Sequence, residues 1–324
     1  MLRFLFLVLT LACAAMPAQA QDTYPSKPVT LIVPFPAGGP MDKLARELVE
    51  AMKPHLRQPL VIQNLSGAGG NLGSAIAMRT AADGHTLLLN HINMATSPSL
   101  YRTLGFKPEA DFEPLGVFVE SPLVLVGRPQ VKAGSVVELL RWIAAQPQVK
   151  LANAGPGSAS HLCGLLLQSS LKISMTTVPY RGTAPAMTDL LGGHVDLMCD
   201  LTANAIPHVQ AAKLKPIAVT SAKPLLGTQL AGVPTTTRLG IADTELSIWY
   251  GLYAPKGTPP AIQQQINEAL AKAIRGEAFG KAQAAAGIQL VHDSRLTPAG
   301  HREFLRAELA RWNRVIKAAG VYAD

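Results

Sequence analysis

The sequence predicts an α/β protein built from two doubly wound units. Short apolar runs alternate with helix-patterned runs between residues 29 and 89, and the same alternation returns between residues 149 and 220. This rhythm is typical of parallel sheets covered by helices. Three glycine-rich segments, residues 34–42, 64–70 and 153–161, each lie between an apolar run and a helix. Because the first amides of a helix lack internal partners and carry partial positive charge, such turns favour binding of a small anion.

The first unit begins with a strand and an amphipathic helix. Residues 29–33 are a continuous, largely β-branched apolar run that suits a buried parallel strand. Pro40 then stands where the first turn of a helix tolerates proline. One face of the expected helix carries apolar residues at three- and four-residue spacing: Met41, Leu44, Ala45, Leu48, Val49 and Met52. Strands at 60–62 and 85–89 and a short helix at 74–79 follow. Ligands of such sheets bind beyond the carboxyl ends of the strands.

The second unit repeats this order. Its strands are expected at 149–153, 177–179, 195–199 and 217–220, and its helices at 160–170 and 184–191. Extended runs at 118–126 and 247–254 are expected to carry the chain into this unit and back. The chain then divides into lobe 1, residues 21–121 and 250–324, and lobe 2, residues 122–249. The last helices are expected to pack back on lobe 1, at residues 260–274, 277–286 and 298–319.

The N-terminus has the features of an export signal. Arg3 supplies a positive charge, residues 5–16 form an apolar core, and Ala18-Gln19-Ala20 is a small-x-small cleavage site. The apolar core is shorter than the ~20 residues that a membrane span needs. Cys13 would permit a lipoprotein, but the residues before it form a poor acylation context. Cleavage after Ala20, which removes residues 1–20 as a signal peptide, and a periplasmic location are therefore expected.

The charge of the chain favours small anions as partners. Lysine and arginine number 29 against 21 aspartate and glutamate residues, a net charge of +8. The basic residues are scattered, without runs or interleaved aromatic residues, so no nucleic-acid partner is expected. A diffuse positive field of this kind steers small anions toward a protein.

Cys163 and Cys199 are the two cysteines that remain after removal of the signal peptide. Cys163 falls in an expected helix and Cys199 near the end of an expected strand, and their spacing gives no signal for pairing. Two cysteines are also too few for a disulfide scaffold and match no zinc motif. The sequence therefore predicts two mostly unpaired thiols and no metal site.

The second glycine segment matches a dinucleotide-binding fingerprint only in part. Gly67, Gly69 and Gly73 follow the pattern, but the third glycine is one residue late. Asn90 and His91 stand where an acidic residue would hold the ribose. No nicotinamide or flavin cofactor is therefore expected. The alternative for all three segments is a glycine loop that serves only to pack a strand tightly against a helix.

The sequence contains few features of a hydrolase. The sequence has no Gly-x-Ser-x-Gly elbow, no His-Glu-x-x-His motif and no P-loop. Ser158, Ser160 and His161 lie close together in the sequence, yet serine at the start of a helix is usually a cap. His161 is then either a packed or capping side chain or a group that faces a ligand. A binding protein is favoured over an enzyme, and a secreted serine hydrolase using these residues is the alternative.

Three charged residues are further candidates for the ligand site, each with a structural alternative. Arg181, at a strand–loop–helix joint, could fork onto a carboxylate or form a salt bridge within the protein. Asp200 follows an apolar run and is expected at a strand end facing the cleft, where it could accept a hydrogen bond from a ligand ammonium or hydroxyl; it could instead cap a helix. For Asp42, capping of first-turn amides is favoured.

Several motifs, taken together, resemble one known family. They are Val33-Pro34-Phe35-Pro36-Ala37-Gly38-Gly39-x-x-Asp42-x-x-Ala45-Arg46, Asn64-x-x-Gly67-Ala68-Gly69-Gly70-x-x-Gly73, Asp83-Gly84-His85-Thr86-Leu87-Leu88, Gly157-Ser158-x-Ser160-His161-Leu162, Val178-Pro179-Tyr180-Arg181-Gly182, Asp189-Leu190-Leu191-Gly192-Gly193-His194-Val195-Asp196 and Val233-Pro234-Thr235. In this order, and over nearly the whole mature chain, they are similar to the Bug-type periplasmic solute receptors. Those receptors are the binding components of tripartite tricarboxylate transporters.

The resemblance implies a type 2 periplasmic binding protein fold, with two doubly wound lobes that close on a ligand in a central cleft. The ligand would be a small organic carboxylate, which the receptor, expected to be a monomer, passes to membrane permease subunits. A sensor that presents the ligand to a membrane signalling partner is the alternative. The resemblance implies that the loops at residues 38–39, 66–70 and 158–161 contribute to the cleft. Together with the residues weighed above, the expected ligand-binding residues are Phe35, Gly38, Gly39, Asp42, Ser66, Gly67, Ala68, Gly69, Ser158, Ser160, His161, Arg181 and Asp200.

Within this set, the first glycine loop carries the sharpest expectation. The amides of Gly38 and Gly39 are expected to hold a ligand carboxylate, in a turn whose backbone at Gly39 a branched side chain would not fit. Three residues depart from the family pattern: Ala37 stands where proline is common, Met41 where a small polar residue is common, and Cys199 where an aromatic residue is common. These departures touch the expected pocket wall and so bear on which ligand is bound.

Overall fold

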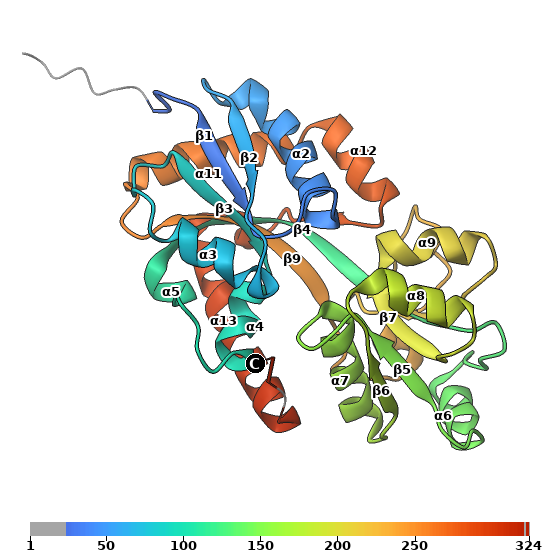
Figure 1. The fold of residues 1–324 in the computed structure, drawn as a ribbon. Coiled ribbons are helices and arrows are strands. Elements are labelled where there is room, and N and C mark those ends of the chain that lie inside the picture. Colours follow the sequence, from blue (N-terminus) through green and yellow to red (C-terminus); the bar gives the residue numbers. More distant parts are fainter. Residues whose placement is uncertain (1–23, 321, 324) are drawn as a thin grey trace, which may run out of the picture.

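A computed structural model of the chain describes residues 24–320, 322 and 323. Two groups of strands and helices are joined by the long strands β4 and β9, which run through the middle of the molecule (Figure 1). The expected signal peptide, its cleavage site after Ala20, and Cys13 lie outside the described residues.

The first sheet follows the order β2–β1–β3–β9–β4, with β10 on the far edge of β4. Its strands are β1 (Val29–Val33), β2 (Leu60–Asn64), β3 (Thr86–His91), β9 (Ser247–Pro255), β4 (Phe112–Gly127) and β10 (Gln289–Leu290). The first three strands are parallel, and β9 and β4 then run antiparallel to their neighbours. The carboxyl ends of β1, β2 and β3 therefore point to one edge of the sheet, where the first two glycine segments begin.

The second sheet continues from the distal end of β4. That strand pairs with β9 up to Pro122 and with β7 from Leu123 onward. The remaining strands are β5 (Lys150–Asn153), β6 (Thr176–Pro179), β7 (Leu197–Leu201) and β8 (Lys215–Val219). We call the elements on the first sheet lobe 1 and those on the second sheet lobe 2.

Helices cover both sheets (Figure 1). They are α2 (Pro40–Met52), α3 (Asn71–Ala77), α4 (Asn93–Leu100), α5 (Pro108–Asp111), α6 (Val136–Ala144), α7 (Ala159–Leu171), α8 (Thr183–Leu191), α9 (Thr202–Gln210), α10 (Thr236–Leu239), α11 (Pro260–Ile274), α12 (Glu277–Ala285) and α13 (Pro298–Ala319), with short 3-10 turns η2 (Lys53–His55), η3 (Ala68–Gly70) and η4 (Ser294–Leu296). Five of the six apolar residues on the expected face of α2 are fully buried, and Val49 is partly buried. Among the described residues, no helix combines the length and apolarity that crossing a membrane requires.

Some elements depart from the expectations. β4 begins at Phe112 rather than near residue 118, and β7 begins at Leu197 rather than 195. The helix α4 was not predicted, because its polar residues and internal Pro98 give no amphipathic repeat. Its position is decided by tertiary packing, since it lies along α13 from the other end of the chain (Figure 1).

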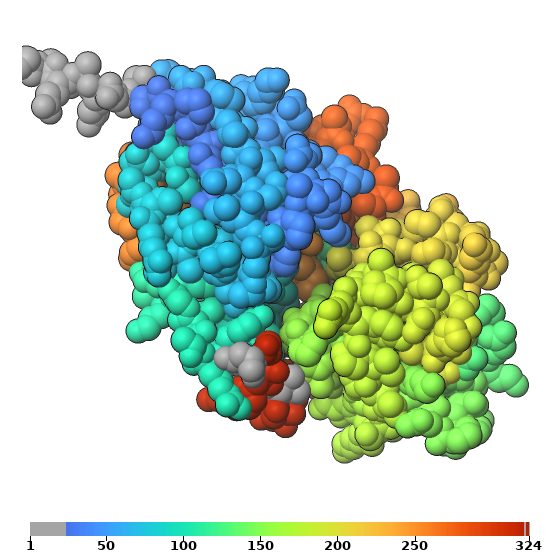
Figure 2. Space-filling view, in the orientation of Figure 1, coloured from blue at the N-terminus to red at the C-terminus, as the bar shows by residue number. Residues whose placement is uncertain are grey.

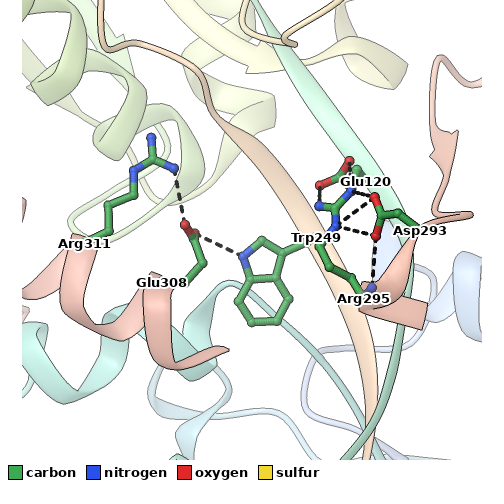
Figure 3. Close-up of polar contacts among 6 residues, drawn as sticks. All are labelled: Glu120, Trp249, Asp293, Arg295, Glu308 and Arg311. Atoms are coloured by element: carbon green, nitrogen blue, oxygen red, sulfur yellow. Dashed lines mark hydrogen bonds and ion pairs between the residues drawn. The ribbon is translucent and has the colours of Figure 1, made fainter. Parts of the chain in front are cut away.

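Two clusters of polar contacts, which together we call the charged network, lie beside the two crossing strands on one side of the sheet. Arg295 of η4 pairs with Glu120 of β4 and with Asp293. On α13, the buried carboxylate of Glu308 accepts a hydrogen bond from the Trp249 indole of β9 at 3.3 Å (Figure 3). Because alternate residues of a strand face opposite sides of the sheet, Ile248 and Tyr250 point away from this network.

The structure overturns the prediction that the two cysteines are unpaired. Cys163 of α7 and Cys199 of β7 form a disulfide, with their Cα atoms 6.1 Å apart. The sequence pattern could not show this, because the two residues are 36 positions apart and meet only when α7 packs on β7. The bond ties the helix that follows the third glycine segment to the strand that carries Asp200.

Candidate functional site

A cavity of about 330 Å³ lies between lobe 1 and lobe 2, beside β9. In the space-filling view the two lobes meet along a groove between the blue–cyan and the green–yellow parts of the chain (Figure 2). The cavity is lined by Phe35, Gly69, His91, Ile92, Asn93, Ser97, Leu100, Tyr101, Ala154, Pro156, Gly157, Ser158, Ala159, Leu201, Ile248 and Tyr250. None of these side chains is an aspartate, glutamate, lysine or arginine. An anion in this cavity would therefore depend on amides and neutral polar groups.

The first glycine loop brings Phe35 to the cavity and is held by Asp42. The buried Asp42 carboxylate accepts hydrogen bonds from the Gly38 amide at 2.9 Å and from the Arg46 and Asn64 side chains. The Arg46 hydrogen bond, followed by that from the Gly38 amide, lowers the pKa of Asp42. Asn64, at the end of β2, also donates to the Phe35 carbonyl at 3.0 Å. Asp42 therefore fixes the loop that presents Phe35, and it does not line the cavity itself.

Gly38 and Gly39 are placed differently from Phe35. The Gly38 amide donates to Asp42 and the Gly39 amide to the Pro36 carbonyl at 3.3 Å, so both have partners within the protein. Neither residue lines the cavity. The left-handed backbone of the turn lies at Gly38, with φ +80°, whereas Gly39 has φ −78°. The prediction that the backbone at Gly39 would not accept a branched side chain was wrong, because Gly39 has an extended conformation. The conformation that favours glycine occurs one residue earlier, at Gly38.

From the second glycine segment, Gly69 reaches the cavity. Ser66, Gly67 and Ala68 are exposed on the rim of lobe 1 and do not line it. Gly69 has φ +62°, and a Cβ at this position would lie 2.6 Å from the Tyr101 hydroxyl oxygen. Its carbonyl accepts a hydrogen bond from the Asn93 side chain. Glycine is therefore required here both by the backbone and by the close approach of Tyr101.

The third glycine segment contributes Ser158 and the start of α7. Ser158 is the N-cap, and its hydroxyl accepts the His161 amide at 3.2 Å. The Ser160 hydroxyl accepts the Ala154 amide at 2.8 Å, and His161 Nδ1 accepts the Gly157 amide at 3.0 Å. Ser160 and His161 thus hold the loop from within and do not line the cavity, whereas Ser158 does.

Two amides at the start of α7 remain open. The Ala159 and Ser160 N–H groups have no hydrogen-bond acceptor within the part of the chain that the structure describes. Ala159 lines the cavity, so this helix start faces the enclosed space. Unpaired first-turn amides at the positive end of a helix of 13 residues are donors suited to a carboxylate.

The same loop lacks the contacts of a serine hydrolase. The hydroxyls of Ser158 and Ser160 lie 3.1 Å apart and contact each other, and neither is hydrogen-bonded to the His161 ring. The ring nitrogen Nδ1 of His161 is occupied by the Gly157 amide, and burial lowers the pKa of the imidazole. A serine nucleophile needs a base within hydrogen-bond reach, and this arrangement does not provide one.

Arg181 and Asp200 both lie outside the cavity lining. Arg181 is exposed and has no ion pair with the described residues, so the salt bridge considered as its structural alternative is not formed. Asp200 is buried; its Oδ1 accepts the Leu201 amide and the Asn204 side chain, and its Oδ2 has no partner among the described residues. Burial outweighs these bonds and raises the pKa of Asp200 to about 6.

The main residues that the sequence did not single out as binding residues form an aromatic wall. The ring of His91, at the end of β3, lies 5.0 Å from the Phe35 ring and 5.7 Å from the Tyr250 ring. His91 Nδ1 accepts the Asn93 amide at 3.1 Å, which leaves the proton on Nε2, and burial lowers the pKa of this imidazole to about 3. His91 follows an apolar strand run, a position that could have marked it. Tyr250 carries no such signal, because it reaches the site from a distant part of the chain.

Comparison with known families decides the class of protein. Residues 44–321 match the model of the tripartite tricarboxylate transporter family receptor. The chain belongs to this family. This is a family of solute-binding receptors and not a family of enzymes. No group of three or more histidine, cysteine, aspartate or glutamate residues in the described part of this receptor could hold a metal ion.

Solved structures confirm the expected type 2 periplasmic binding protein fold. The periplasmic binding protein BugD is 38% identical, with a TM-score of 0.78 and alignment over 92% of this chain and 99% of that one. MatC from Rhodopseudomonas palustris, solved with bound malate, is 32% identical, with a TM-score of 0.77 and coverage of 90% and 100%. Rpa4515 from R. palustris, solved with adipate, is 31% identical, with a TM-score of 0.80 and coverage of 92% and 99%. This receptor is therefore a periplasmic solute-binding protein of the Bug type.

Proposed function

We propose that this receptor binds a small organic carboxylate in the cavity between its lobes and delivers it to the permease subunits of a tripartite tricarboxylate transporter. The observation that carries the proposal is the pair of open amides of Ala159 and Ser160, at a helix start facing that cavity. The carboxylates in the structures of MatC and Rpa4515, malate and adipate, support the ligand class. The receptor is proposed to act without catalysis, which agrees with the lack of a hydrogen bond between the His161 ring and the hydroxyls of Ser158 and Ser160 among the described residues.

The proposed motion is closure of the lobes about β4 and β9. β4 changes its partner from β9 to β7 after Pro122, which lies opposite Ser247, the first residue of β9; this supports a boundary close to residues 121/122 and 249/250. Lobe 1 would then be residues 21–121 with 250–324, and lobe 2 would be residues 122–249. Hinge closure around a ligand is the usual behaviour of periplasmic binding proteins. The polar candidates outside the cavity lining, Arg181 and Asp200, would approach the ligand only in a further closed form.

We further propose that the chain is exported and cleaved after Ala20, and that it works as a monomer. The net charge of +8, which becomes +7 when Arg3 is removed with the signal peptide, would assist capture of an anion by steering. Delivery to a permease is proposed over presentation to a signalling partner because the family is defined by the transporter.

Removal of one amide tests the proposed carboxylate site. Ala159 is the first residue of α7, where proline fits the helix but has no N–H to donate. Ser158 before it has ψ 159°, which proline accepts in its predecessor. By calorimetry with a panel of mono- and dicarboxylates that includes malate and adipate, Ala159→Pro should weaken the best-binding carboxylate about tenfold or more.

Two control variants separate the lost donor from other effects. Ala159→Val places a larger side chain at the cavity but keeps the backbone N–H, so this variant should retain more affinity for the carboxylate than Ala159→Pro. Glu277→Pro makes the same change at the first residue of α12, which does not line the cavity, and should leave binding intact. If Ala159→Pro binds as tightly as the wild type, the carboxylate is held elsewhere. If no carboxylate of the panel binds the wild type, the proposed function is wrong.

A further inference from the structure

We propose that the cavity selects a monocarboxylate with a flat aromatic body, and that His91 is the residue that determines this selectivity. The inference rests on the proposed function and narrows its ligand class. It follows from three features of the cavity: the wall that His91 builds with two other rings, the single open anion cradle, and the neutrality of every side chain that lines the space.

The first feature is a continuous aromatic wall. His91 is the middle ring: Phe35 lies tilted against it at 37°, and Tyr250 meets it edge-on at 80°. The three rings come from the loop after β1, the end of β3 and the middle of β9, and all line the cavity. Offset and edge-to-face contacts are the favoured geometries of aromatic rings. A planar apolar ligand would extend this stack, and Leu100, Leu201 and Ile248 complete an apolar surround.

The second feature is a difference between the two helices that begin at the cavity, α4 and α7, in the number of free backbone N–H donors. At α7 the amides of Ala159 and Ser160 are open, as described above. At α4, Asn93 is the only first-turn residue that lines the cavity, and its amide already donates to His91 Nδ1 at 3.1 Å. One of the two N–H groups of the Asn93 side-chain amide is also used, since it donates to the Gly69 carbonyl. One carboxylate therefore finds free backbone donors at α7, and the opposite end of the cavity offers no free backbone donor at Asn93.

The third feature is the absence of a compensating charge for a second carboxylate. No aspartate, glutamate, lysine or arginine is among the residues lining the cavity. His91 does not supply a cation, because burial lowers its pKa to about 3 and Nδ1 is held as an acceptor. Burying an unpaired carboxylate is costly, whereas an uncharged ring is favoured in the same place. His91 thus has two roles. Its ring packs against the ligand body, and its Nδ1 accepts the Asn93 amide, so that this donor is not available to a second carboxylate.

Calorimetry with four defined probes tests the selectivity. The probes are benzoate, cyclohexanecarboxylate as its non-planar counterpart, terephthalate as benzoate with a second carboxylate, and adipate as a flexible dicarboxylate. The wild type should bind benzoate about tenfold or more tighter than terephthalate or adipate, and several-fold tighter than cyclohexanecarboxylate. If terephthalate or adipate binds more tightly than benzoate, the ligand class inferred here is wrong, while the proposed carboxylate receptor stands. If none of the four probes binds, the inference is wrong.

Variants at position 91 test the role of His91 itself. His91→Ala removes the ring and opens the Asn93 amide, so it should weaken benzoate about tenfold and reduce the preference over terephthalate by more than that factor. His91→Phe restores a flat ring without Nδ1, so it should recover most of the benzoate affinity lost in His91→Ala. His55→Ala, at an exposed histidine of η2, is the matched control and should bind all probes as the wild type does.

Melting curves separate these outcomes from misfolding. If His91→Ala melts within a few degrees of wild type and keeps the wild-type ratio of benzoate to terephthalate affinity, His91 does not determine selectivity. If His91→Ala is unfolded, the His91→Phe protein provides the test. A terephthalate affinity that rises relative to that of benzoate supports the proposal that Nδ1 occupies the Asn93 amide, and an unchanged ratio overturns it.

Discussion

Leu100 of lobe 1 and Gly157 of lobe 2 touch across the boundary between the lobes. A Cβ at Gly157 would lie 3.0 Å from Leu100 Cδ1, and Gly157 has φ +75°. Both residues line the cavity, so the space for a ligand depends on how closely these two elements approach. The backbone at Gly157 therefore favours glycine, and a Cβ there would also press on Leu100.

Gly157→Ala is expected to destabilise the protein by about 1–3 kcal/mol, because it strains the backbone and also presses on Leu100. Gly227→Ala is the matched control: Gly227 has nearly the same φ, +76°, but nothing lies within 4 Å of its Cβ position. Urea unfolding should show a smaller loss for the control. Adding Leu100→Ala should lessen the effect of Gly157→Ala, as expected for residues in contact. Equal losses at Gly157 and Gly227 would show that the contact is not tight.

The Cys163–Cys199 disulfide should be present in exported protein. Thiol counting on denatured, unreduced protein is expected to find no free thiol, and two free thiols would contradict the bond seen here. The double variant Cys163→Ala, Cys199→Ala should lose about 2–4 kcal/mol of stability, chiefly because the unfolded chain gains freedom. Because the bond ties α7 to β7, the double variant should also speed hydrogen exchange of the backbone amides at the start of α7. Hydrogen exchange at the Leu162 amide, which donates to the Ser158 carbonyl, measures that change.

Asp200 should make the receptor more stable in mild acid. Its pKa is raised to about 6 by burial, whereas an aspartate in an unfolded chain has a pKa of about 3.9. Because the folded state holds the proton more tightly, the free energy of unfolding should rise as the pH falls through about 6 and level off near about 4, a gain of roughly 2–3 kcal/mol.

Asp200→Asn is expected to remove this part of the pH dependence. Urea unfolding of the wild type and the variant between about pH 4 and 8 makes the comparison. Asp243→Asn, at an exposed aspartate, is the control and should leave the wild-type slope in place. If Asp200→Asn and the wild type have parallel stability profiles, the Asp200 carboxyl is not buried as described.

The polar cluster of Trp249, Trp312 and Arg311 should depend on Glu308. Its Oε2 accepts the indole N–H of Trp249 at 3.3 Å and of Trp312 at 3.0 Å, and its Oε1 lies 3.4 Å from Arg311 (Figure 3). Glu308→Ala leaves two buried indole donors and a guanidinium without this acceptor, and should cost about 3–5 kcal/mol. Glu308→Gln keeps an acceptor and should cost less. Glu303→Ala, on an exposed position of the same helix, should be close to neutral; an equal loss there would show that the cost does not come from the hydrogen bonds of Glu308.

Local patterns predicted several elements closely. The helices α11 and α13 have the expected bounds, 260–274 and 298–319, because each opens with a proline and then follows a long helical repeat. The strand β1 was equally clear from its apolar run. By contrast, α4 and the first six residues of β4 carry no periodic signal, and packing against α13 and β9 decides their form.

The sequence by itself determined the α/β class, the family and the loops that reach the cavity, because these depend on short contiguous motifs. Phe35, Gly69 and Ser158 all come from such loops. Only the tertiary structure decided the rest. Tyr250 and His91 are 159 positions apart along the chain, yet their rings pack at 5.7 Å because β9 returns beside β3. Whether an amide is free, as at Ala159, or occupied, as at Gly38, likewise depends on which side chain folds back onto it, and that is settled by contacts between segments that no local pattern records.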